Sequence, residues 1–154
     1  MHNFAITISA PGTDPDEVFR TLADYERYPE LTEAVLRASV EEGDEGHERC
    51  TWEVKFRRGI LIWTEDGIVD PIQRRIDFSL VEGDLDSLDG HWRVAEAPGG
   101  SLIIFDCRFD MGIPTLEHLI EPVAADTLRD NVVDMCEGLF GATEVVDDKS
   151  TVHH

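Results

Sequence analysis

The sequence contains a series of alternating segments, all but the first of them between residues 50 and 109, and one long helical pattern follows them. Alternation of apolar and polar side chains over roughly four to eight residues is typical of a half-buried strand. Short turn signals separate these segments, so neighbouring strands are expected to pair antiparallel. The alternating segments are 3–9, 50–56, 60–65, 75–81, 88–95 and 101–109.

Two short helices are predicted directly after the first strand. Asp14 can cap the first helix, Pro15 suits its first position, and Glu17 has the spacing of a capping box. Pro29 is expected to end this helix. A second short helix is predicted over residues 31–36.

The long helical pattern runs from about residue 116 to residue 140, and a polar tail at 142–154 is expected to fray. Strands that are segregated from helices indicate an α+β fold. The expected architecture is a single domain over residues 1–141, in which a curved antiparallel sheet wraps around the long helix. One side of that helix carries Leu128, Asn131, Met135 and Leu139.

The pair of segments 50–56 and 60–65 forms the clearest hairpin. If Arg58-Gly59 is a two-residue turn, the register follows from it. The inward face of the second strand then carries Leu61, Trp63 and Glu65, and the acid is the unusual member of that face. The opposed pairs in this register are Phe56 with Leu61, Val54 with Trp63, and Trp52 with Glu65.

Charge and composition limit the classes of function. The chain has 154 residues, enough for one domain, and a formal net charge of −20. Phosphate backbones and anionic membranes would repel it, so we expect neither nucleic acid nor a membrane as a partner. The three cysteines are far apart and contain no CxxC pair, which favours free thiols in a cytoplasmic protein over a metal or disulfide framework.

Several segments resemble a known superfamily. Residues 24–31, DYERYPEL, are similar to a segment of START-like cyclases and coenzyme Q-binding proteins. Trp63, Gly90-His91-Trp92 and Phe109-Asp110-Met111 lie where single-domain aromatic polyketide aromatase/cyclases of the tetracenomycin type carry similar residues. The resemblance covers about residues 4 to 140, and it implies a helix-grip (SRPBCC) fold with a ligand cavity.

In the aromatase/cyclases that the chain resembles, the cavity receives a poly-β-ketone chain and promotes aldol ring closure and loss of water. That chemistry needs a base for an activated methylene and a donor for the developing oxyanion. The resemblance places the family's asparagine at Asn131. The family's arginine falls on Gly67 and its tyrosine on Val35, so two polar groups of the family are absent here.

Two polar residues are candidates for catalysis. Glu65 among inward tryptophans would be desolvated, which raises a carboxyl pKa into the range of proton transfer. The alternative is a carboxylate at the strand end near solvent, or one paired with an arginine. Asn131 interrupts an apolar helix face and could bind a ligand oxygen, or it could be a core amide bonded to backbone.

The candidate lining of the cavity is mainly aromatic, and ordinary core packing is the alternative for each of its members. Cys107 is interpreted as a small buried hydrophobe rather than a nucleophile, because no partner base is evident. The candidate substrate-binding residues are Tyr28, Trp52, Trp63, Trp92, Phe105 and Cys107.

Two functions remain open on the sequence alone. The first is a polyketide aromatase/cyclase or dehydratase, without metal or cofactor, whose substrate an acyl carrier protein could deliver. The second is a non-catalytic protein that binds or transports a lipid, a quinone or a polyketide product. The protein is expected to be a monomer or a homodimer.

Overall fold

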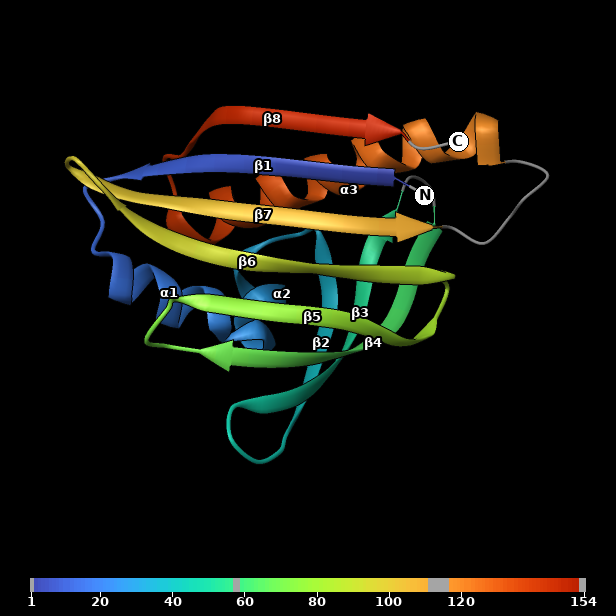
Figure 1. The fold of residues 1–154 in the computed structure, drawn as a ribbon, viewed down its shortest axis with the longest axis horizontal. Coiled ribbons are helices and arrows are strands. Elements are labelled where there is room, and N and C mark those ends of the chain that lie inside the picture. Colours follow the sequence, from blue (N-terminus) through green and yellow to red (C-terminus); the bar gives the residue numbers. More distant parts are fainter. Residues whose placement is uncertain (1, 57–58, 111–116, 153–154) are drawn as a thin grey trace.

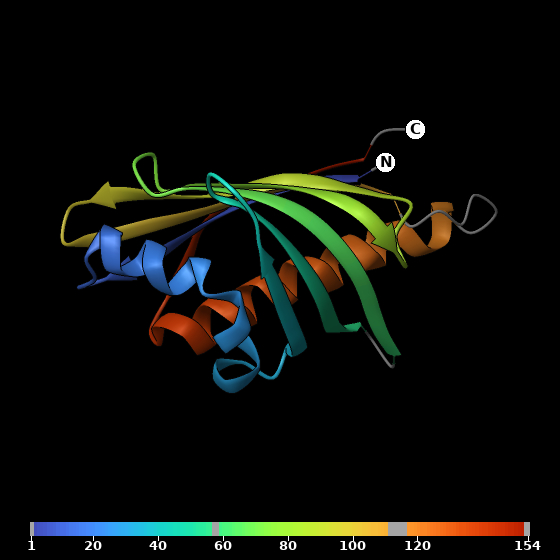
Figure 2. The same ribbon diagram turned by 90° about the horizontal axis from the view of Figure 1, so that it is seen from below.

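The fold is an eight-stranded antiparallel sheet that curves over one long helix, as the computed structural model shows (Figures 1 and 2). The structure describes residues 2–56, 59–110 and 117–152. The strand order across the sheet is β2-β3-β4-β5-β6-β7-β1-β8. The elements are β1 (His2–Pro11), α1 (Pro15–Ala23), η1 (Tyr25–Arg27), α2 (Tyr28–Leu31), β2 (Val35–Glu42), β3 (His47–Phe56), β4 (Gly59–Asp70), β5 (Arg75–Gly83), β6 (Ser87–Ala97), β7 (Gly100–Asp110), α3 (Glu117–Phe140) and β8 (Glu144–Val152).

All helices lie on the concave side of the sheet (Figure 2). The inward positions of the strands are apolar and form one core with the buried face of α3, to which Val132, Met135 and Cys136 contribute. The outward positions are mostly polar, as expected of an antiparallel sheet with one solvated face. The α+β helix-grip architecture expected from the sequence is therefore confirmed.

The region between α1 and β3 differs from the prediction. α1 ends at Ala23, and Pro29 lies in the first turn of α2, where its missing N–H is tolerated. The helix expected over 31–36 is wrong in its bounds, because residues 35–42 form strand β2. A register shift between Val35 and Arg37 interrupts the alternation of β2, which explains why the sequence pattern missed it.

The tail is also more ordered than expected. Residues 144–152 form β8, which pairs antiparallel with β1 and becomes an edge of the sheet. Its sequence, EVVDDKSTV, is charged in the middle and has no clean alternation. Charged side chains are common on edge strands because they discourage pairing with other chains. The expectation of a frayed tail was wrong for residues 144–152, because the charged edge strand lacks the alternation by which a strand is recognised in a sequence.

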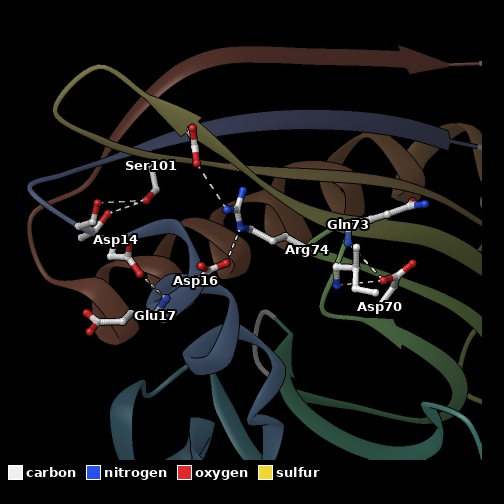
Figure 3. Close-up of polar contacts among 10 residues, drawn as sticks. Asp14, Asp16, Glu17, Asp70, Gln73, Arg74 and Ser101 are labelled. Carbon is white, nitrogen blue, oxygen red and sulfur yellow. Dashed lines mark hydrogen bonds and ion pairs between the residues drawn. The ribbon is translucent and has the colours of Figure 1, made fainter.

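Arg74 connects α1 to the sheet (Figure 3). Its guanidinium donates to Asp16 of α1 at 2.8 Å and lies 3.5 Å from the carboxylate of Glu96 on β6. The turn before it is organised by Asp70, whose carboxylate accepts from the backbone N–H groups of Ile72 and Gln73. The β4–β5 turn thus presents Arg74 to the first turn of α1.

Close contact between α3 and α2 depends on Gly138. A Cβ on Gly138 would overlap the carbonyl oxygen of Leu31 and lie 2.9 Å from Cβ of Thr32. In an exposed helix, replacement of glycine by alanine stabilises by roughly 1 kcal/mol. Here we expect the opposite, a destabilisation of about 1–3 kcal/mol from overpacking.

Urea unfolding of Gly138→Ala measures this effect, and Glu137→Ala, on the exposed face of the same helix, serves as the control. We expect a lower midpoint for Gly138→Ala and little change for the control. A raised midpoint for Gly138→Ala would show that the two helices separate without cost.

Candidate active site

A buried carboxylate lies at the centre of the concave face. Glu65 of β4 is only 5% exposed. Its Oε1 accepts a hydrogen bond from Nε1 of Trp52 at 2.7 Å, and its Oε2 accepts one from Nε1 of Trp63 at 3.2 Å. Each carboxylate oxygen thus has an indole donor. Glu65 is not near solvent, and no arginine among the described residues pairs with it.

The two tryptophans are placed by the β3–β4 hairpin. Trp52 lies directly opposite Trp63, and the rings stack with centroids 6.3 Å apart and an interplanar angle of 24°. Glu65 is two residues further along the same face of β4, opposite Cys50. The predicted register was therefore displaced by two residues. The predicted faces are nevertheless correct, because the side-chain period of a strand is two.

Two features of β5 shape the sheet beside Glu65. The β4–β5 register shifts between Thr64 and Glu65, and such bulges bend a sheet locally. Gly83, at the end of β5, has a φ of +138° and lies against the backbone of β4. A Cβ there would be 2.6 Å from the carbonyl oxygen of Ile62 and would overlap Trp63, so glycine allows this approach.

Burial raises the pKa of the Glu65 carboxyl to about 7 from its usual 4.5. The two indole hydrogen bonds oppose this shift because they stabilise the charged form, whereas the charge of Glu48 adds to it. Near neutral pH the carboxyl is thus present in both protonation states. A group in this condition can both accept and donate a proton.

Glu65 faces a small cavity between the sheet and α3. The cavity measures about 70 Å³. A cavity of roughly 150 Å³ holds one benzene molecule, so a larger ligand requires the lining side chains to separate. The lining residues are Phe4, Trp52, Val54, Trp63, Glu65, Phe78, Leu85, Leu88, Trp92, Phe105, Cys107, Leu128, Asn131, Val132 and Met135.

Comparison with known proteins agrees with this geometry. A family model described as polyketide cyclase/dehydrase and lipid transport matches residues 12–136. The chain belongs to this family. The sequence has no significant match among curated proteins.

Several solved structures share the fold at low sequence identity. TTHA0849 from Thermus thermophilus is 21% identical, with a TM-score of 0.82 over 89% of this chain and 93% of that chain. The Zhui aromatase/cyclase from Streptomyces sp. R1128 is 18% identical, with a TM-score of 0.72 over 92% of both chains. A START superfamily protein from Mycobacterium smegmatis is 16% identical, with a TM-score of 0.75 over 91% and 97%.

Seven of the eight site residues predicted from the sequence lie in the cavity wall. They include both polar candidates, Glu65 and Asn131. Tyr28 does not line the cavity: its hydroxyl donates to the carbonyl of Leu22, and its ring packs against Trp52 at 5.5 Å. The structure therefore places Tyr28 in the core that supports Trp52. The five remaining wall residues from the prediction are Trp52, Trp63, Trp92, Phe105 and Cys107.

Asn131 is half-buried in α3 and connects the helix to the sheet. One N–H of its side-chain amide donates to the carbonyl oxygen of Lys55 on β3 at 2.6 Å. This is the backbone bond that the sequence analysis set against a ligand role. Because the amide has a second N–H and a carbonyl oxygen, and because it also borders the cavity, the two roles are compatible.

Cys107 contacts the cavity as a protonated thiol. Burial raises its pKa well above the usual value, and the negative charge of Glu65 adds to this. A thiolate is the nucleophilic form, so a thiol in this environment is unreactive. Two further cysteines, Cys50 and Cys136, are buried and free as well.

Gly67 and Val35, which stand at the positions of the family's missing polar groups, are not among the residues that line the cavity. A Cβ on Gly67 would meet the carbonyl oxygen of Asp77 at 3.5 Å and Glu48 Cγ at 3.7 Å. Val35 is buried opposite Val54. Among the described side chains of the cavity wall, Glu65 and Asn131 are the two that carry oxygen atoms.

A larger hollow of about 1050 Å³ lies on the outer face of the sheet. Ion pairs line it, such as Arg49–Asp66 and Arg75–Asp77, and these groups are largely solvated. It is an open hollow with many charged groups in its wall, and we do not assign the site to it. In the part of the chain that the structure describes, no group of three or more His, Cys, Asp or Glu side chains is arranged to hold a metal ion. No helix within the same ranges is long and apolar enough to cross a membrane.

Sequence reasoning missed Tyr25, an aromatic side chain that supports the site from behind Trp52. Tyr25 is buried, and its ring packs on Trp52 with centroids 4.7 Å apart. It belongs to the same DYERYPEL segment as Tyr28, so the segment was recognised but the supporting role of its first tyrosine was not. Other members of the wall were also missed, among them the aromatic Phe4 and Phe78.

Proposed function

We propose that this protein is a polyketide cyclase/dehydratase that uses Glu65 as its acid–base group. The observation that carries this proposal is the burial of the Glu65 carboxyl between two indoles at the wall of an apolar cavity, with a pKa of about 7. An acid–base group is most effective when its pKa lies near the working pH. The family model that matches the chain supports the same class of reaction.

Ring closure begins when the Glu65 carboxylate takes a proton from a methylene between two carbonyls. The resulting enolate carbon forms a bond to a second carbonyl carbon, and protonated Glu65 returns its proton to the alkoxide oxygen. For dehydration, the carboxylate takes another proton from carbon and passes it to the departing hydroxide. Water leaves, and Glu65 returns to its starting state.

The other polar groups of the wall have supporting roles in this proposal. The second N–H of Asn131 is positioned to donate to a ligand oxygen as negative charge develops there. Trp63, Trp92 and Phe105 stack on the planar rings that form. Because the cavity is small, binding must first separate α3 from these side chains, and an acyl carrier protein would deliver the chain at that stage.

A second candidate function is a non-catalytic binding or transport protein for a lipid, a quinone or a finished polyketide. The observation that favours it is the mainly apolar cavity wall. In addition, Gly67 and Val35 stand in the sequence where the resembling enzymes carry an arginine and a tyrosine. In this function the protonated carboxyl of Glu65 donates a hydrogen bond to a ligand oxygen and transfers no proton.

Wild-type protein separates the two candidates. A poly-β-ketone thioester is incubated with the protein, and cyclised product is quantified against the spontaneous reaction. In parallel, an aromatic product is titrated while tryptophan fluorescence is recorded. We expect product above the spontaneous rate together with quenching. Quenching without turnover favours the binding protein. The absence of both signals would contradict both candidate functions.

A further inference from the structure

A second carboxylate lies on the same concave face as Glu65. Glu48 of β3 is opposite Gly67, and Glu65 is two residues before Gly67 on β4. Diagonal neighbours of this kind have Cα atoms about 7–8 Å apart, within reach of two glutamate side chains. The negative charge of Glu48 also adds to the rise in the pKa of the Glu65 carboxyl.

One carboxylate oxygen of Glu48 is buried, and the rest of its side chain lies near solvent. Its side chain is half-buried, and its Oε1 is buried without a hydrogen-bond partner among the residues that the structure describes. Partial burial and the nearby charges of Glu42 and Glu26 raise its pKa. Glu48 therefore reaches from the surface toward the interior in which Glu65 lies.

The hydroxyl of Tyr25 completes this group. Tyr25 Oη is buried and, within the described ranges, also has no hydrogen-bond partner. The charges of Glu65 and Glu48 both act on it and, together with burial, hold its pKa well above the usual range, so it stays protonated. Buried polar atoms that lack a protein partner are normally satisfied by an ordered water, which needs two to four polar contacts.

We propose that Glu48 is a proton relay between solvent and Glu65, through a water held by the Tyr25 hydroxyl. This inference rests on the proposed acid–base role of Glu65. Glu65 is only 5% exposed, and both of its carboxylate oxygens already accept from indoles. A route through the half-buried Glu48 connects this carboxyl with solvent.

The relay transfers one proton in three steps. Protonated Glu65 gives its proton to the water, the water passes a proton to the Glu48 carboxylate, and Glu48 releases it to solvent. Glu65 is then the carboxylate that begins ring closure. Within the part of the chain that the structure describes, the titratable groups that face the pair are Tyr25 and Glu26 of η1, Tyr28 of α2, Glu42 of β2, Cys50 of β3 and Cys107 of β7. None of these six supplies positive charge.

Carboxyl ¹³C relaxation dispersion on ligand-free protein with labelled glutamate measures the proton exchange of Glu65 near neutral pH, and Glu65→Gln assigns the signal. We expect Glu48→Gln and Tyr25→Phe each to slow this exchange by about tenfold or more. Glu48→Gln also lowers the pKa of Glu65, because a neighbouring negative charge is removed. Glu53→Gln, on the opposite face of β3, is the matched control and should leave both quantities unchanged.

An exchange rate within twofold of wild type in both variants overturns the relay, even if the pKa of Glu65 falls in Glu48→Gln. If Glu48→Gln does not fold, Tyr25→Phe decides the matter by the same criterion. The measurement uses no substrate. It therefore remains decisive whether or not Glu65→Gln retains ring closure, which is the separate test of the proposed function.

Discussion

Glu65→Gln lowers the rate of ring closure by about 10²- to 10⁴-fold, the usual contribution of a positioned acid–base group. Glutamine has nearly the same shape and keeps an acceptor for one of the two indoles, but it cannot exchange a proton. Binding of an aromatic product should change only a few-fold, because the apolar wall is intact. Product formation from a poly-β-ketone thioester gives the rate, and fluorescence titration gives the affinity.

The control for this experiment is Glu53→Gln, which makes the same chemical change on the outward face of the neighbouring strand. It should behave as wild type in both assays. Full ring-closure activity in Glu65→Gln would exclude Glu65 as the acid–base group. A parallel loss of product binding would instead indicate that the substitution has damaged the cavity.

The stability of Glu65→Gln should depend on pH differently from that of wild type. The folded protein holds the Glu65 proton up to a pKa of about 7, whereas the unfolded chain releases it near 4.5. Folded protein thus binds more protons in this window, and its stability falls as pH rises through it. The whole penalty, about 3 kcal/mol, is present above about pH 7 and absent below about pH 4.5.

Glutamine does not titrate, so the stability of the Glu65→Gln variant lacks the pH-dependent penalty that the Glu65 carboxyl causes in wild type. At low pH the free energy of unfolding of the variant should be about 1 kcal/mol below that of wild type, because the glutamine NH₂ group cannot accept a hydrogen bond from the second indole. Above pH 7 it should be more stable than wild type by roughly 2 kcal/mol. Urea unfolding at several pH values measures the difference between the two proteins. A constant difference across the range would mean that Glu65 titrates in the folded protein as it does in water.

The position of Glu65 could be predicted from the sequence even though its register could not. The turn was set one residue too late, and this displaced the opposed pairs by two. A displacement of two preserves every face, so Glu65 and Trp63 still pointed inward. The hydrogen bonds to Glu65 depend on the true register, in which Trp52 is opposite Trp63, and no local pattern specifies it.

The missed strands share a physical cause. β2 contains a register shift near its start, and β8 is a charged edge strand. Both are defined by pairing with residues distant in the sequence, and neither has the alternation that reveals a strand locally. The interaction of Glu48 with Glu65 was missed for a similar reason, since Glu48 is half-buried and lies beyond the segment read as a strand.

The pairing of β1 with β8 has a mechanical consequence. His2 lies opposite Val152, so the two described ends of the chain are neighbours at one corner of the sheet (Figure 1). A force that pulls these ends apart acts across the ladder rather than along it. It opens the backbone hydrogen bonds one after another from that corner, as in unzipping, and β8 detaches before the strands that surround the cavity bear any load.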